Sequence, residues 1–586
     1  MHGLTIVGLL FLATTVCTSG SERGEWWQVD IAQGPVRGRK DPNDDLYVFY
    51  NIPYATAPTG DHKFKAPLPP ISWNEPYDAI DEGIICPQAI LAPFMPESLK
   101  KKEDCLIANI YVPITQKKNL PVLVYIHGGG FQVGYGDWLK AKNLMKPKDF
   151  IVVTFNYRLG IHGFLCLGTE DVPGNAGMKD QVALLRWVQH NIAVFGGNPK
   201  DVTISGYSAG SASVDLVMLS KSAEGLFHKV IPESGSNLAV FALQRDPLQN
   251  AKDHAKTLNF TNTDDIYALE KFYKTLPYDI LTADNFLDRS DTLLFSPCLE
   301  IDRGKEVFLT ETPRSILKRG DYNKVPLLYG FANMEGLFRL RFFNDTKDRM
   351  NEKFSDYLPE DLKFDSADKK EEIAQRVKEF YFGNGPIDNN DILKYVDYFT
   401  DIVFAYSSLK SVQLHIAAGH KDIYLYEYSF VDDDTPVIPH TNVRGADHCA
   451  QTMAVLDGKN MTYLIEDDEM SEEYKNMKNT IRQIWHNFVI AGKPVPDGSS
   501  LPAWPAVGAN GSPHMSLGQK LELRGALSEE MFYFWDDIYE KYYQAPIPPS
   551  YLTAAMSYFH TFRACHFFEK PRPQRDVIFI VSGATS

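Results

Sequence analysis

Ser208 is a candidate nucleophile, because of its residue type and the turn in which it lies. Ser208 is central in Gly206-Tyr207-Ser208-Ala209-Gly210, which fits the pattern G-x-S-x-G. A short apolar run at 202–205 precedes this turn, and helix-like sequence follows it. A strand that turns so sharply into a helix strains its central residue, and only small neighbours let the backbone pass. The pattern therefore predicts a nucleophilic serine hydroxyl, with an ordinary glycine-rich turn as the alternative.

A glycine run earlier in the chain could supply the hydrogen-bond donors that a serine nucleophile needs. The run Gly128-Gly129-Gly130 follows an apolar stretch at 121–126. Attack on a carbonyl produces an oxyanion, and glycine backbones can direct several N–H groups at one point. We expect the N–H groups of Gly129, Gly130 and Ala209 to form an oxyanion hole. A phosphate-binding loop is disfavoured because no Gly-Lys-Ser or Gly-Lys-Thr follows, and a flexible turn is the other alternative.

A histidine must accept the serine proton, and in folds with a G-x-S-x-G turn it follows the acid in the chain. Of the 15 histidines, His440 and His448 lie after residue 335 in plausible post-strand loops. His448 lies among small residues at 445–449, as a projecting base should, whereas His440 follows Pro439 and could be a plain surface residue. We expect His448 to be the base, with His440 as the alternative.

The acid that orients the histidine is predicted to be Glu335. Glu335 follows the apolar run 325–331 and precedes Gly336, which suits a carboxylate turned inward at a loop. A solvated surface carboxylate is the alternative. Asp447 is rejected, because neighbouring side chains on an extended segment point to opposite faces.

The elements that must position these residues are a series of buried strands with intervening helices. Helical spacing of apolar residues occurs at 180–194. Continuous apolar strands that alternate with helices predict an α/β fold with a large, mostly parallel central sheet flanked by helices. Functional sites in such sheets form outside the carboxyl ends of the strands, where the candidate residues fall. The predicted strands are 121–126, 150–155, 202–205, 325–331 and 423–430.

Composition narrows the function classes further. The chain has 586 residues, of which 44% are hydrophobic and 23% charged, as in globular proteins. A net charge of −16 disfavours nucleic-acid binding, which needs a basic surface. No CxxC or HExxH spacing occurs, so we expect no metal site and no cofactor.

The N-terminus predicts secretion. Residues 3–16 are apolar and have the length of a signal-peptide core, so we expect residues 1–19 to be a signal peptide; a buried strand is the alternative. No membrane span is predicted, since the apolar run at 577–581 is too short. A proline-rich stretch at 545–549 separates a C-terminal extension, 544–586, from the rest. Four sequons agree with secretion: Asn259, Asn344, Asn460 and Asn510.

Together these motifs resemble the type-B carboxylesterase/cholinesterase family of α/β-hydrolases, and most resemble its secreted insect carboxylesterases. The resemblance runs from about residue 28 to 543, so we expect one esterase domain at 20–543. It implies a mixed central sheet, insertions that form a gorge, and a Ser208–Glu335–His448 triad at the base of that gorge. The matching segments include 34–38, 52–55, 103–106, 127–131, 156–160, 195–197, 206–210, 234–235 and 504–505.

The resemblance also implies a disulfide between Cys86 and Cys105. The 18 residues between them would give a loop whose closure contributes about 3 kcal/mol on the chain-entropy model. Cys17 would leave with the signal peptide. The other cysteines lie in apolar or mixed contexts, and we expect them to be buried thiols: Cys166, Cys298, Cys449 and Cys565.

Several positions depart from the pattern of the family. Tyr207 stands where Glu or Gln is common, Gln451 stands where Asp or Glu is common, and Glu233 stands where Gln is common. The 86–105 loop has no tryptophan that could hold a quaternary ammonium by a cation–π contact, so we expect poor turnover of choline esters. Phe338 resembles a gorge aromatic.

The resulting prediction is a serine carboxylesterase that works through an acyl-enzyme. Its expected substrates are apolar or neutral small esters of xenobiotic, odorant or lipid-derived type. A non-catalytic cholinesterase-like adhesion or binding protein is one alternative, although such relatives usually lack a triad member. A specialised hormone esterase is the other.

Overall fold

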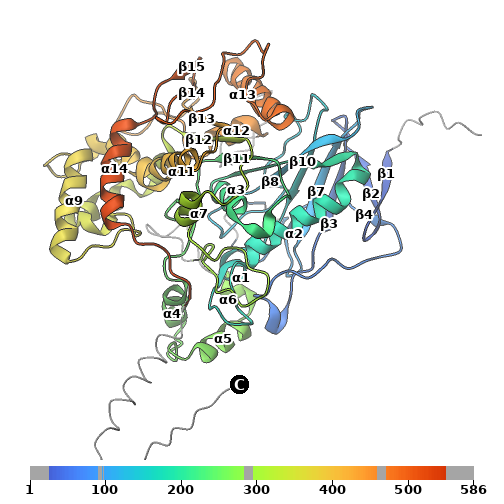
Figure 1. The fold of residues 1–586 in the computed structure, drawn as a ribbon, viewed down its shortest axis with the longest axis horizontal. Helices are drawn as coiled ribbons and strands as arrows, with labels where there is room; N and C mark the ends of the chain where they lie inside the picture. Colours follow the sequence, from blue (N-terminus) through green and yellow to red (C-terminus); the bar gives the residue numbers. More distant parts are fainter. Residues whose placement is uncertain (1–24, 90–94, 97, 283–294, 458–469, 550–586) are drawn as a thin grey trace, which may run out of the picture.

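A large mixed sheet forms the centre of the molecule (Figure 1). The computed structural model describes residues 25–89, 95–96, 98–282, 295–457 and 470–549. In sheet order the strands are β1 (Trp26–Ile31), β2 (Gly34–Lys40), β3 (Leu46–Pro53), β7 (Ile107–Pro113), β9 (Ile151–Phe155), β8 (Leu120–Ile126), β10 (Gly197–Tyr207), β11 (Lys229–Glu233), β12 (Leu327–Ala332), β13 (Ile423–Tyr428), β14 (His514–Leu517) and β15 (Leu521–Arg524). Short β4 (Tyr77–Asp78) pairs with β2, and β5 (Ile84–Ile85) pairs with β6 (Lys100–Lys101).

The centre of this sheet is parallel and its edges are antiparallel. Strands β9, β8, β10, β11, β12, β13 and β14 run parallel to their neighbours in that order. The pairs β1–β2, β2–β3, β3–β7, β7–β9 and β14–β15 are antiparallel. The predicted parallel core is therefore present, and the antiparallel N-terminal part adds to it.

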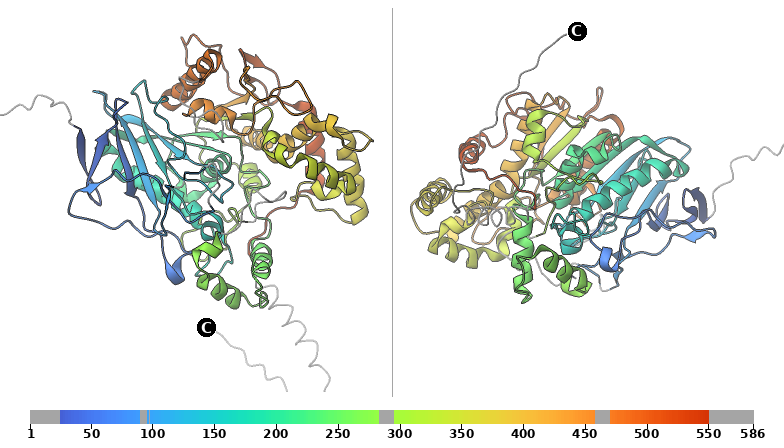
Figure 2. Two further views of the ribbon diagram at one scale, coloured as in Figure 1. Left: turned by 180° about the vertical axis from the view of Figure 1, so that it is seen from behind. Right: turned by 60° about the horizontal axis from the view of Figure 1, so that its bottom comes forward.

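Helices flank both faces of the sheet (Figure 2). They are α1 (Gly160–Phe164), α2 (Ala176–Asn191), α3 (Ala209–Leu219), α4 (Pro247–Thr257), α5 (Ile266–Thr275), α6 (Tyr278–Leu281), α7 (Pro313–Arg319), α8 (Phe343–Glu352), α9 (Ala367–Tyr381), α10 (Ile392–Thr400), α11 (Tyr406–Ala417), α12 (Ala450–Val455), α13 (Glu472–Ala491) and α14 (Glu529–Tyr542). A 3-10 helix, η5 (Glu335–Phe342), follows β12, and a π-helical turn, η8 (Asp401–Ala405), joins α10 to α11.

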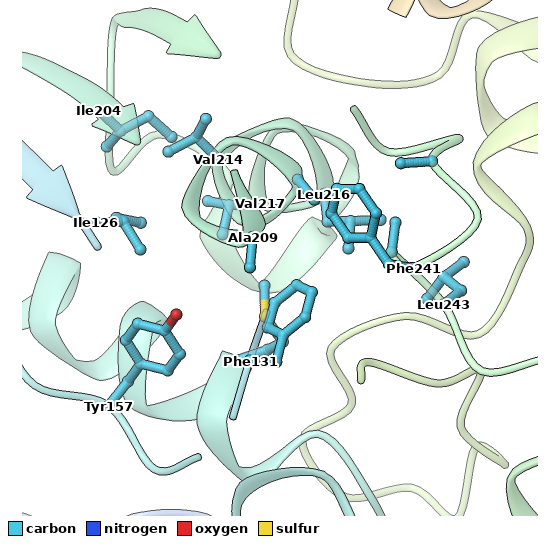
Figure 3. Packing of buried hydrophobic residues seen from close by; sticks show 14 of the residues in the cluster. Ile126, Phe131, Tyr157, Ile204, Ala209, Val214, Leu216, Val217, Phe241 and Leu243 are labelled. Atoms are coloured by element: carbon cyan, nitrogen blue, oxygen red, sulfur yellow. The ribbon is translucent and has the colours of Figure 1, made fainter. Parts of the chain in front are cut away.

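Alternation along the central strands divides the core into two layers. In β8, Val124 packs with residues of α2 and α3, whereas its neighbour Tyr125 packs with residues of α13 on the opposite face. Successive side chains of a strand point to opposite faces, and a strand covered on both faces is apolar throughout. Helix α3 is buried along its whole length, and Figure 3 shows apolar side chains around it.

Within the described residues, two disulfides tie loops to this frame. Cys86 is bonded to Cys105. Cys166 is bonded to Cys298, so the expectation that both are thiols was wrong. Their 132-residue separation gave no local signal, and they meet because the loop that contains Cys298 returns to the end of α1. Cys449 is a buried free thiol, as expected, and Cys17 and Cys565 lie outside the described residues.

Candidate active site

Ser208 stands alone between β10 and α3. Tyr207 ends the strand, Ala209 begins the helix, and Ser208 adopts φ 55° and ψ −121°. This positive φ is strained for a residue with a side chain. The Ser208 N–H donates to the Glu233 carbonyl oxygen at 2.8 Å. A side chain at Gly210 would overlap the Ile126 carbonyl oxygen, which explains the small residue after the turn.

His448 reaches Ser208 from the loop that follows β13. Its Nε2 lies 2.9 Å from Ser208 Oγ. The alternative base, His440, is exposed on the same loop and makes no hydrogen bond to Ser208 among the described contacts. The ring of His448 remains 15% exposed, so the imidazole is accessible to a substrate on one side.

Glu335 completes the arrangement from the start of η5. Its Oε2 lies 2.5 Å from His448 Nδ1, and the carboxylate is fully buried. Oε1 accepts hydrogen bonds from the Ala332 N–H at 2.7 Å and from the Ser234 hydroxyl. Because a carboxylate faces Nδ1, that nitrogen carries the imidazole proton and Nε2 offers its lone pair to Ser208.

Two further polar residues, Gln451 and Asp447, lie near Glu335 and His448. Gln451 donates from Nε2 to Ser234 Oγ at 2.6 Å, so the amide that replaces a family carboxylate supports the partner of Glu335. Asp447 makes no ion pair with His448 among the described residues. Burial and the nearby Glu335 charge raise the pKa of Asp447 to about 6, although His448 opposes this.

The glycine run lies against the nucleophile turn. A Cβ at Gly128 would lie 2.6 Å from the Tyr207 carbonyl oxygen, so the loop can approach this closely only without a side chain. Gly129 and Gly130 have φ 101° and 62°. Among the described residues, no acceptor is found for the N–H groups of Gly129, Gly130 and Ala209. Three unpaired donors are thus available near Ser208.

A buried imidazole supports this loop. His127 donates from Nδ1 to the Gly128 carbonyl oxygen at 2.8 Å and stacks on Tyr157 with ring centroids 4.4 Å apart. Burial lowers the pKa of His127 to about 4, so the ring is neutral at pH 7. Figure 3 shows Tyr157 and Phe131 beside Ala209 at the start of α3.

Comparison with known proteins shows which family shares this sequence. A sequence profile described as the Carboxylesterase family matches residues 27–535. The chain belongs to the carboxylesterase family. Ester hydrolysis is therefore its activity, and the predicted family and enzyme class are confirmed.

Individual members of the family are similar along most of the chain. Juvenile hormone esterase of Heliothis virescens is 32% identical over 498 residues, which cover 81% of this chain and 87% of that relative. Liver carboxylesterase of Sus scrofa is 31% identical over 547 residues, 88% of this chain and 93% of the relative. The crystal structure of juvenile hormone esterase from Manduca sexta with OTFP covalently attached has a TM-score of 0.78 at 31% identity, covering 88% of this chain and all of that one. These likenesses confirm the α/β-hydrolase fold.

Aromatic rings form a wall beside the base of this carboxylesterase. Phe404, in η8, lies with its ring centroid 4.5 Å from that of His448. Phe338 lies 5.6 Å from His448 and 5.7 Å from Phe404. The sequence predicts Phe338 as a gorge aromatic, but it does not predict Phe404. Phe404 lies in a π-helical turn, and such turns are frequent at functional sites. No local sequence pattern predicts a π-helical turn, so the sequence carries no signal for this residue.

The described part of the chain contains neither a metal-binding cluster nor a membrane-spanning helix. No group of three or more His, Cys, Asp or Glu residues there could hold a metal ion. No described helix is long and apolar enough to cross a bilayer.

Proposed function

We propose that Ser208, His448 and Glu335 are the nucleophile, general base and orienting acid of this ester hydrolase. The pair of contacts made by His448 carries the proposal: Nε2 is 2.9 Å from Ser208 Oγ, and Nδ1 is 2.5 Å from Glu335 Oε2. With Nδ1–H donated to the carboxylate, the Nε2 lone pair can accept the serine proton. This geometry disfavours a non-catalytic adhesion protein.

In this proposal, Ser208 Oγ bonds to the ester carbonyl carbon while His448 takes the hydroxyl proton. The N–H groups of Gly129, Gly130 and Ala209 hold the oxygen that becomes negative, each contributing about 3 kcal/mol to the lowering of the barrier. Collapse of the intermediate breaks the bond to the alcohol oxygen, which receives the proton from His448. Water then attacks the acyl carbon and gives a proton to His448. The bond from this carbon to Ser208 Oγ breaks, the carboxylic acid leaves, and His448 returns the proton to Ser208.

We infer that the substrates are apolar or neutral small esters of xenobiotic, odorant or lipid-derived type. The aromatic wall of Phe338 and Phe404 beside His448 supports apolar groups at this position. The 86–105 loop offers no tryptophan to a choline head group. Relatives named as a hormone esterase and as a liver carboxylesterase are about equally similar, at 32% and 31% identity, so neither name decides the substrate.

We also propose that the protein is secreted after removal of residues 1–19, with the esterase domain at 20–543 and an extension at 544–586. The relatives include insect esterases. Exposed side chains at Asn259, Asn344 and Asn510 support glycosylation there. Residues 1–19, most of the extension and the remaining sequon, at Asn460, lie outside the described residues.

A panel of esters tests the substrate and the nucleophile together. We expect the purified protein to hydrolyse short nitrophenyl esters and to bind one organophosphate per chain. Ser208→Ala should lose roughly 10³-fold or more of kcat and all labelling. The panel varies acyl and alcohol length and includes choline esters, their neutral isosteres and a hormone-type methyl ester. Labelling that persists in Ser208→Ala would move the nucleophile elsewhere, and a large choline preference would overturn the substrate class.

A further inference from the structure

The buried carboxylate of Glu233 lies behind the proposed triad and has no part in the steps above. Glu233 ends β11 and is 0% exposed. Oε1 accepts hydrogen bonds from Ser205 Oγ at 2.8 Å, the Tyr125 hydroxyl at 3.2 Å and Trp485 Nε1 at 3.4 Å, and Oε2 accepts one from Thr452 Oγ1 at 2.7 Å. Within the described ranges, the side-chain partners recorded for this carboxylate are all neutral donors. A charge buried among neutral donors is costly to retain, which points to a specific role.

Two of these contacts join the elements that carry Ser208 and His448. Ser205 lies in β10, three residues before Ser208, and Thr452 lies in the first turn of α12, four residues after His448. Because Glu233 binds both hydroxyls, it holds α12 at a fixed distance from β10. The backbone of Glu233 contributes as well, since its carbonyl oxygen accepts the Ser208 N–H.

The link between His448 and α12 is too short to absorb a shift of the helix. Cys449 alone separates His448 from Ala450, and it is held at φ 63° and ψ 23°. The Ala450 N–H donates to the Asp447 carbonyl oxygen at 3.0 Å, and the Met453 N–H donates to the Cys449 carbonyl oxygen at 3.2 Å. A displacement of α12 therefore carries the His448 backbone with it.

We propose that Glu233 is a positioning residue of the esterase reaction, which holds His448 against Ser208 by binding Thr452 and Ser205 at once. The inference rests on the proposed function, because it takes Ser208 and His448 as nucleophile and base. Misplacement of a reacting group by about 1 Å can lower a rate roughly 100-fold. Loss of one anchoring bond should therefore lower kcat, while KM changes little because Thr452 is buried behind the site.

Three variants test this role. Thr452→Val removes the hydroxyl that Glu233 binds, and Thr452→Ser keeps it. Thr203→Val is the matched control, because Thr203 is also buried, lies in β10, and has a hydroxyl without a hydrogen-bond partner in the described structure. With a nitrophenyl ester we expect kcat of Thr452→Val to fall roughly tenfold with KM within about twofold, Thr452→Ser to recover most of kcat, and Thr203→Val to match the parent.

Active sites are counted by organophosphate titration, so that kcat refers to folded enzyme. If Thr452→Val does not fold, Thr452→Ala replaces it, since the smaller side chain cannot clash. An unchanged kcat in the folded variant, a change in KM alone, or an equal loss in Thr203→Val would each overturn the inference. Ser208→Ala runs in parallel: retained activity there refutes the proposed function, whereas an inactive Ser208→Ala beside a fully active Thr452→Val refutes only the role of Glu233.

Discussion

Replacement of Glu233 by glutamine should change how stability depends on pH. Burial raises the pKa of Glu233 from 4.5 to about 7, against the hydrogen bonds that favour its charged form. A carboxyl whose pKa is raised by folding stabilises the protein below the unfolded value, and this stabilisation is lost as the pH rises through the folded value. At about 1.4 kcal/mol per pH unit, the gap between 4.5 and 7 corresponds to about 3 kcal/mol.

Glu233→Gln removes the titrating carboxyl and replaces it with an amide side chain of nearly the same shape. Its free energy of unfolding, relative to that of the parent, should therefore rise by about 3 kcal/mol between pH 4 and pH 8. Urea unfolding followed by tryptophan fluorescence at four pH values measures this difference, and titrations common to both proteins cancel. Glu170→Gln is the control: Lys305 holds the pKa of this exposed carboxyl below its usual value, so its difference should be small and opposite in sign. A flat difference for Glu233→Gln would refute the reasoning.

Opening the bridge at Cys298 should cost more stability than opening the one at Cys105, because the sequence separations are 132 and 19 residues. On the chain-entropy model, the free energy of unfolding falls by about 5 kcal/mol for the first bridge and by about 3 kcal/mol for the second. Urea unfolding of Cys298→Ala and Cys105→Ala measures these losses, and equal losses would contradict the loop-length argument. Phe404→Leu should lower kcat/KM roughly two- to fivefold, because the Phe404 ring packs against the imidazole of His448 and restrains its orientation; an unchanged ratio per titrated site would exclude this contribution.

Much of the site could be predicted because its signals are local. Ser208 sits in a strand–turn–helix pattern, and the glycine run follows a continuous apolar strand. Chain order then left few candidates for the acid and the base, and the structure brings Glu335 and His448 to Ser208 by hydrogen bonds. Their chemical roles remain the proposal tested above.

The remainder depends on contacts between distant segments, which no local pattern encodes. Cys166 and Cys298 looked like core thiols because each lies in an apolar or mixed stretch. The antiparallel strands β1 and β2 carry mixed polarity, so no apolar run marked them. Phe404 reaches His448 only because η8 packs against η5, which begins at Glu335. The bond between Glu233 and Thr452 joins residues 219 positions apart.

The position of His448 late in the chain has a consequence for biosynthesis. The nucleophile turn is complete early, but the proposed base follows β13, and the helix that anchors it, α12, ends at Val455. A nascent polypeptide that stops before His448 contains the serine without the imidazole. Under the proposed roles, hydrolytic activity therefore arises only late in translation, and truncated chains that end before His448 cannot hydrolyse esters by this mechanism.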